Sequence, residues 1–153
     1  PEYFKQIINI EREKENPRKD YEKLGNLYDI IGFFYPEVYA DLLKNNALPF
    51  NEKFSHEDIK EVLLTLKDKL DTSLDEQGWF ECMKGIGEAL KFAPNGKLFK
   101  ANPEMYKGSV SDIAEMLRIS LTTKKNSPNL YYVMKVLGDA EWKRRIDLIT
   151  NSL

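Results

Sequence analysis

The sequence is poor in the residues that most often carry chemistry in small proteins. It has one cysteine, Cys82, and one histidine, His56. A single cysteine excludes a disulfide within the chain and any metal site built from several cysteines. Cys82 lies among apolar neighbours in the stretch WFECMKGI, which predicts an inert, buried thiol. This cysteine usage is typical of a reducing compartment, and we expect a cytoplasmic protein.

Long apolar runs and an excess of positive charge are also missing. No run approaches the ~18 apolar residues that a membrane helix needs, and no signal-peptide pattern opens the sequence. Lys and Arg total 23 and Asp and Glu total 25, which gives a formal net charge of −2. A polyanionic ligand would therefore need a local basic patch. The chain begins at Pro1 inside a helical pattern, so we expect a piece of a longer protein.

No motif of an active site is present. His56 begins a predicted helix without a Ser or Cys nucleophile constellation, which indicates a polar surface histidine. The stretch GIGEAL lies in an apolar helical pattern with no preceding strand, so Gly85 and Gly87 are expected to allow close helix packing rather than to hold a phosphate. The acidic residues within 56–61 suit a helix N-terminus. We predict no catalytic residue and no metal ligand.

Hydrophobic residues recur at helical spacing along almost the whole chain. No segment alternates convincingly with a period of two, so the predicted fold class is all-α. Helices are expected at 2–15, 20–35, 36–45, 56–70, 78–92, 112–121, 128–137 and 140–152. One apolar side of the fifth of these consists of Trp79, Phe80, Met83, Ile86 and Leu90.

Polar residues at the expected helix ends support these assignments. Ser55 precedes the helix at 56–70, and Asp58 three residues later makes an acidic variant of the capping box. Ser109 or Ser111 can cap the helix at 112–121. Pro36 fits the first turn of the helix that it opens.

Two stretches interrupt the helical pattern. The connection at 93–108 carries two prolines and two glycines, so we expect it to be mostly irregular, with one helical turn at 103–106. The polar, helix-breaking stretch at 71–78 is the best candidate boundary. It divides the chain into two small helical subdomains, 1–72 and 73–153, although one continuous bundle would show the same pattern.

A basic elbow separates two of the predicted helices. Arg118 lies near the end of the first helix, and Lys124 and Lys125 follow it. Ser127 can cap the second helix, with Pro128 at its first position, and the helix closes at Gly138. Exposed N–H groups, a guanidinium and two ammonium groups would make a surface that favours anions. Alternatively, the cations only complement the dipole of the first helix.

The last third of the chain carries a series of short motifs. They are a helix ending in Leu-Arg-x-x-Leu-Thr, a short loop, Ser/Thr-Pro-x-Leu, a helix closing on Leu-Gly, and a final helix with an arginine. These features fall on Leu117, Arg118, Leu121, Thr122, Ser127, Pro128, Leu130, Leu137, Gly138 and Arg145. Their order and spacing resemble the C-terminal anticodon-binding domain of bacterial-type glutamyl-tRNA synthetases. Upstream, the stretch at 18–39 and its adjacent Phe33 and Phe34 give a weaker resemblance.

The resemblance implies an anticodon-binding helical cage and assigns roles to several residues. Arg118 matches the arginine that contacts anticodon bases. The residues expected to pack against the second and third bases are Ser127, Pro128 and Leu130. Candidate phosphate contacts are Lys124, Lys125 and Arg145. One departure concerns Thr123, which replaces the family's usual glycine and would be strained if that position has a positive φ.

The family's ATP-site signatures, His-x-Gly-His and Lys-Met-Ser-Lys, do not occur in this sequence. We therefore expect no catalysis and no cofactor in this piece, with ATP and Mg²⁺ bound by the parent synthetase. The implied partners are a glutamate tRNA and the catalytic domain of the same synthetase, and we expect a monomer. Two alternatives stay open: a helical protein-interaction module without an RNA role, and the anticodon domain of a class I lysyl-tRNA synthetase.

Overall fold

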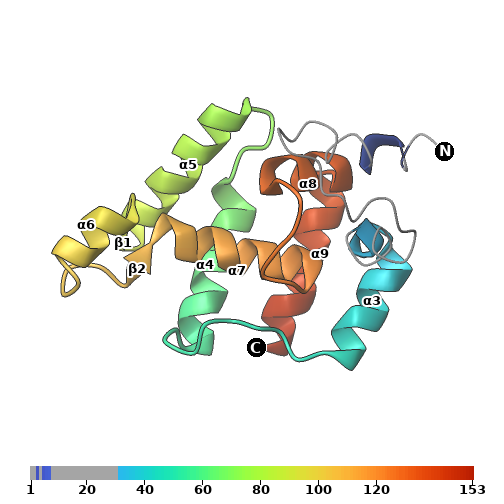
Figure 1. Ribbon diagram of the computed structural model, residues 1–153, viewed down its shortest axis with the longest axis horizontal. Helices are drawn as coiled ribbons and strands as arrows, with labels where there is room; N and C mark the ends of the chain where they lie inside the picture. Colours follow the sequence, from blue (N-terminus) through green and yellow to red (C-terminus); the bar gives the residue numbers. More distant parts are fainter. Residues whose placement is uncertain (1–2, 4, 8–30) are drawn as a thin grey trace, which may run out of the picture.

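The computed structural model of the chain describes residues 3, 5–7 and 31–153. These residues are mostly helical (Figure 1), which confirms the predicted all-α fold class. The elements are η2 (Gly32–Phe34), α3 (Pro36–Asn45), α4 (His56–Lys69), α5 (Glu76–Ala89), β1 (Phe92–Ala93), α6 (Gly96–Ala101), β2 (Gly108–Ser109), α7 (Val110–Thr122), α8 (Leu130–Leu137) and α9 (Asp139–Ser152). The helices expected at 2–15 and 20–35 fall largely outside the described residues.

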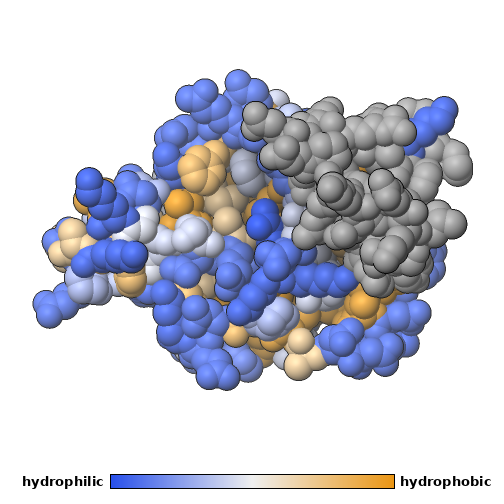
Figure 2. Space-filling view, viewed as in Figure 1, coloured by the Kyte–Doolittle hydropathy of each residue, from blue (hydrophilic) through white to orange (hydrophobic). Residues whose placement is uncertain are grey.

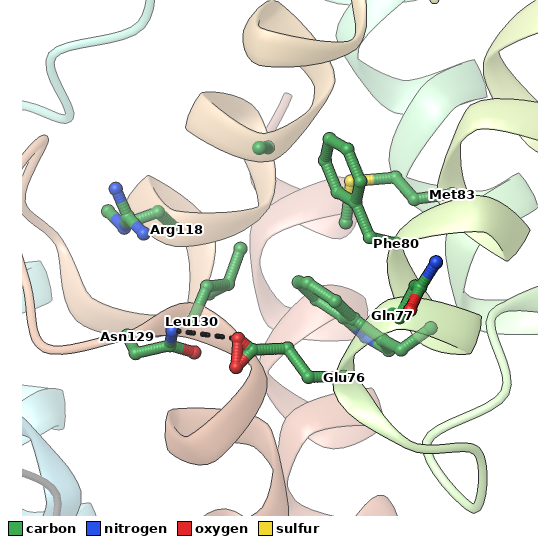
Figure 3. A pocket seen from close by; sticks show the side chains of 9 residues that line it. Glu76, Gln77, Phe80, Met83, Arg118, Asn129 and Leu130 are labelled. Carbon is green, nitrogen blue, oxygen red and sulfur yellow. Dashed lines mark hydrogen bonds between the residues drawn. The ribbon is translucent and has the colours of Figure 1, made fainter. Parts of the chain in front are cut away.

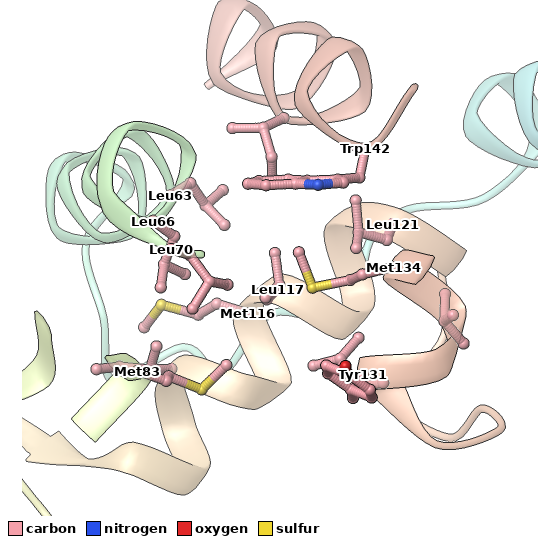
Figure 4. Close-up of a cluster of buried hydrophobic side chains, with 14 of the residues drawn as sticks. Leu63, Leu66, Leu70, Met83, Met116, Leu117, Leu121, Tyr131, Met134 and Trp142 are labelled. Carbon is pink, nitrogen blue, oxygen red and sulfur yellow. The ribbon is translucent and has the colours of Figure 1, made fainter. Parts of the chain in front are cut away.

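The core forms around α7, which packs against α4, α5 and α9, while α8 packs against α9 (Figure 1). Leu117 of α7 and Trp142 of α9 are fully buried at its centre. Figure 4 shows the side chains that surround them, among them Leu63, Leu66, Leu70, Met83, Met116, Leu121, Tyr131 and Met134. Burial of such a side chain contributes roughly 1.5–3 kcal/mol, so this cluster sets how the helices pack.

Side-chain caps fix where several helices begin. The Ser55 hydroxyl accepts from the Asp58 N–H at 3.1 Å, as predicted. Of the two serines considered for α7, Ser109 is the cap, and it forms a capping box with Asp112. Pro36 stands at the first turn of α3 as expected. These local signals were sufficient to predict where the helices begin, because each depends on residues no more than three positions apart.

The predicted start of α8 was wrong. The helix begins at Leu130, and the cap is Asn129, whose side-chain oxygen accepts from the Tyr131 N–H at 3.0 Å. Pro128 precedes the helix, and the Ser127 hydroxyl donates to the Pro128 carbonyl instead of capping. The Asn129 side chain therefore binds N–H groups at the start of α8 that the sequence predicts to be open to an anion.

The connection at 93–108 holds more structure than predicted. The helical turn lies at α6, because the Asn95 side chain accepts from the Leu98 N–H at 2.8 Å, and 103–106 is not helical. On either side of α6, β1 and β2 pair in parallel with Phe92 opposite Gly108. The predicted irregular connection is thus a small projecting lobe beside α5 (Figure 1).

The α5 helix differs from its prediction in three details. A Cβ added at Gly87 would lie 2.9 Å from Ile113 Cδ1, which confirms close packing there, whereas a Cβ at Gly85 would meet nothing. Phe80 belongs to the predicted apolar side but is 37% exposed. Cys82 is only half-buried, and its thiol lies 3.5 Å from the Lys69 carbonyl oxygen.

Residues on both sides of the predicted boundary at 71–78 belong to one hydrophobic cluster. The boundary segment itself is anchored, because the Thr72 hydroxyl donates to Asp139 at 2.6 Å and Tyr131 donates to the Leu74 carbonyl at 2.6 Å. Lys135 also donates to the Thr72 carbonyl at 3.1 Å. The division into 1–72 and 73–153 stays an interpretation of the sequence.

Arg145 is fully buried, so its assignment as a phosphate contact was wrong. Its Nη1 donates to the carbonyls of Phe33 and Leu121, both at 2.8 Å, and its Nε donates to Glu141 at 2.7 Å. The guanidinium also lies 4.1 Å from the centre of the Tyr39 ring. It therefore joins α9 to η2, α3 and the end of α7, and its role in this structure is to hold the fold together.

We predict that Arg145→Ala lowers the free energy of unfolding by about 3–5 kcal/mol, because it breaks a buried charge pair and leaves two carbonyls without their donor. The matched control is Arg144→Ala, since Arg144 binds the same Glu141 carboxylate with a side chain that is 49% exposed. It should cost less than about 1 kcal/mol. Urea denaturation followed by circular dichroism measures both, and equal losses would contradict the structural role of Arg145.

We further predict a loss of stability in acid that depends on Asp139. Hydrogen bonds from Thr72 and Trp142 hold the pKa of this carboxyl below its ordinary value. A lowered folded-state pKa contributes stability above the unfolded pKa of about 4, and this contribution disappears as the pH falls through the lower folded value. Asp139→Asn should therefore flatten the decline of the unfolding free energy below about pH 5, relative to Glu88→Gln, which removes one exposed charge from α5. Parallel curves for the two variants would contradict this assignment.

Candidate nucleic-acid interface

A pocket of about 560 Å³ opens between α5, α7 and the start of α8. Figure 3 shows Arg118 of α7 on one side, with Phe80 and Met83 of α5 across from it. The lining consists of Glu76, Gln77, Trp79, Phe80, Met83, Ala114, Arg118, Asn129 and Leu130. Over α5, hydrophobic surface is exposed between hydrophilic residues (Figure 2). The pocket thus combines apolar walls with a few polar groups, as small-molecule and base-binding sites do.

Arg118 is the cation of this pocket. Its side chain is half-buried, and its Nε atom is buried without a hydrogen-bond partner. Burial lowers the pKa of the guanidinium, and the charge of Glu115 raises it. An arginine stays protonated in spite of such a shift, so a positively charged planar group stands at the pocket with donor capacity to spare.

Phe80 supplies an exposed aromatic face in the same pocket. Phe80 is 37% exposed, and the Lys84 ammonium lies 4.8 Å from the centre of its ring. Leu130 and Met83 add apolar surface around it. An exposed ring across a pocket from a guanidinium is suited to a flat ligand that stacks and carries hydrogen-bond acceptors on its edge, such as a nucleobase.

Glu76 and Asn129 close the pocket on its third side. The Asn129 amide nitrogen lies 3.3 Å from Glu76 Oε2, which links the first turn of α5 to the cap of α8 (Figure 3). The oxygen of the same amide caps α8. Both ends of the Asn129 side chain are therefore engaged, so its orientation is fixed by the fold.

The structure brings together only part of the predicted site. Arg118 and Leu130 line the pocket, whereas Ser127 and Pro128 precede α8 without lining it. Lys125 is exposed and Lys124 is half-buried in the elbow. Sequence reasoning missed Glu76, Trp79, Phe80 and Asn129 as pocket residues. A cap signal at Asn129 was present in the sequence, but nothing local indicated that α5 would face α7.

The elbow takes its shape from the end of α7. The Tyr39 hydroxyl donates to the Ser120 carbonyl at 2.6 Å, and the Thr122 hydroxyl donates to the Arg118 carbonyl at 2.8 Å. Thr123 then adopts a left-handed conformation with φ of 69°. The predicted condition for strain is therefore met, because a β-branched residue stands where glycine is favoured.

Within residues 3, 5–7 and 31–153, no group of three or more His, Cys, Asp or Glu side chains could hold a metal ion. Over the same residues, no helix is long and apolar enough to span a bilayer.

We predict that Thr123→Gly is more stable than Thr123→Ala by about 1 kcal/mol, because both variants remove the buried hydroxyl and methyl group but only alanine keeps the cost of a Cβ at positive φ. At ordinary helical positions the order is the reverse. Thermal and urea unfolding of the two variants provide the comparison. An alanine variant as stable as the glycine variant would show that the left-handed conformation costs nothing here.

Comparison with known proteins bears on what this pocket is for. The chain is 36% identical over 149 residues to a glutamate–tRNA ligase of Clostridium beijerinckii, which covers 96% of the chain and 27% of that protein. A glutamate–tRNA ligase of Clostridium perfringens is 32% identical over 143 residues, which covers 94% of the chain and 26% of that protein. One of Sorangium cellulosum is 34% identical over 146 residues, which covers 95% of the chain and 25% of that protein. The chain thus spans about a quarter of the length of the curated relatives it matches.

A family model described as the anticodon binding domain matches residues 17–150. This match covers α3 to α8 and most of α9, and it includes every residue that lines the pocket. The chain therefore belongs to the anticodon binding domain family and is homologous to the corresponding part of glutamate–tRNA ligases.

Proposed function

We propose that this chain binds the anticodon loop of a glutamate tRNA and that the pocket between α5, α7 and α8 receives an anticodon base. The observation that carries the proposal is Arg118, a half-buried guanidinium with an unpartnered Nε, facing an exposed phenylalanine across the pocket. A guanidinium can donate to the Watson–Crick edge of an unstacked base, and an aromatic ring can stack on its face.

In this proposal the basic elbow serves the RNA backbone. Lys125 is exposed at the elbow, and Lys124 lies beside it at the end of α7. Two ammonium groups in the loop that joins α7 to α8 suit phosphates of the RNA backbone, because phosphate contacts position the strand without reading its sequence. Arg145 takes no part in this, since it is buried in the fold.

The catalytic step belongs, in the same proposal, to another part of a glutamate–tRNA ligase. The relatives named above carry that name, and their additional length would hold the domain that binds ATP with Mg²⁺ and activates glutamate. The partners would be the glutamate tRNA and that catalytic domain, with one copy of the chain acting in the cytoplasm. The family favours RNA over a protein-interaction role, and the relatives favour glutamate over lysine specificity.

The test is a titration of the chain, at low and moderate salt, against fluorescent tRNAs that carry either the glutamate anticodon or a scrambled one. We expect a preference for the glutamate anticodon that weakens with salt, because phosphate contacts release counterions. Arg118→Ala should remove roughly 1–3 kcal/mol of this preference, which is about the value of a good contact to a base edge.

Lys125→Ala is the matched control for charge. It should weaken binding to both tRNAs equally and reduce the salt dependence by about one phosphate contact. Binding that ignores the anticodon and survives Arg118→Ala would refute the assignment of this pocket.

A further inference from the structure

A carboxylate stands in the pocket that is proposed to receive a polyanion. Glu76 is half-buried at the first position of α5, and it lines the pocket together with Arg118. Favourable interaction with the helix dipole explains an acidic residue in the first turn. It does not explain why this carboxylate reaches over to the cap of another helix, 53 positions away in the sequence.

The contact with Asn129 fixes where the Glu76 carboxylate lies. Because the Asn129 oxygen accepts from the backbone of α8 at 3.0 Å, the amide nitrogen must face Glu76, which it meets at 3.3 Å. That contact occupies one of the two carboxylate oxygens. A carboxylate offers about four acceptor positions in all, so most of its acceptor capacity stays available to a ligand.

We infer that Glu76 is a specificity-determining residue of this pocket, which accepts a hydrogen bond from an N–H or amino group on the edge of the bound base. The inference rests on the proposed function, because it assumes RNA in the pocket. Arg118 offers donors from α7 and Glu76 offers an acceptor from α5. A nucleobase edge carries both acceptors and donors, whereas a phosphate carries acceptors only.

The opposed charges give the pocket its selectivity. Arg118 alone would attract any phosphate that came within reach, and a second cation in place of Glu76 would do so more strongly. The carboxylate repels phosphate and leaves the pocket to a base whose donor matches it. A base that carries an acceptor on the edge facing Glu76 would bring two acceptors together without a hydrogen bond between them. Such a contact costs binding free energy in a partly desolvated site.

The test uses a set of anticodon stem-loop RNAs in which each anticodon base is changed singly, titrated against the chain and its variants. The wild-type chain should discriminate about tenfold at one position. Glu76→Gln should bind the RNAs with a mismatched base at that position more tightly, because it removes a repelling charge, and should reduce the discrimination at that position to threefold or less. Glu76→Asp, which keeps the charge on a shorter side chain, should lose the discrimination without the gain in affinity.

Glu88→Gln is the matched control, since Glu88 is an exposed acid of the same helix that does not line the pocket. It should alter affinity slightly and equally for all the RNAs. Melting temperatures verify that each variant is folded.

Two results would overturn the inference, and they are distinguishable. If Arg118→Ala abolishes discrimination but Glu76→Gln and Glu76→Asp leave it at the wild-type value, Glu76 does not read the base and the proposed function stands. If the wild-type chain binds all the RNAs equally and Arg118→Ala changes nothing, the pocket is not the reading site, and the inference falls with the proposed function.

Discussion

The buried guanidinium of Arg145 holds together the end of the molecule that carries the elbow. The last carbonyls of a helix have no intrahelical donors. Arg145 donates to one such carbonyl of α7, that of Leu121, and also to the carbonyl of Phe33 in η2. Tyr39 of α3 donates to the neighbouring Ser120 carbonyl. Because helices α3, α7 and α9 meet through these contacts, the direction in which the chain leaves α7, and with it the position of the elbow, follows from the network.

Arg118 and Arg145 illustrate how surroundings decide the role of one residue type. Arg145 has a carboxylate, two carbonyls and an aromatic ring around it, and is fully buried. Arg118 is half-buried at the pocket, and its Nε has no hydrogen-bond partner. The first binds four groups of the fold through Nε, Nη1 and the face of its guanidinium and contributes to stability, although its Nη2 is also buried without a partner. The second has a donor left over at the wall of an open pocket, where a ligand can reach it, which is the state expected of a group that binds a ligand.

Local signals in the sequence predicted well where a few neighbouring residues decide the outcome. The cap at Ser55 and the capping box at Ser109 are examples, since each involves residues within one helical turn. At the start of α8, Ser127 and Asn129 were both chemically suited to capping. Asn129 became the cap in the folded chain, where its amide also meets Glu76. That contact joins segments far apart in the sequence, so no local pattern could indicate it.

By itself, the sequence determined the helical character of the chain and the family motif around Arg118, because periodicity and short-range motifs depend on neighbouring residues. Only the tertiary structure decided that Arg145 is buried and that Arg118 lines a pocket. It also decided that Glu76 and Phe80 of α5 line the same pocket. The physical reason is that burial and pairing are properties of helix packing. Packing brings together residues that are dozens of positions apart, and this proximity sets both the charge of the site and its shape.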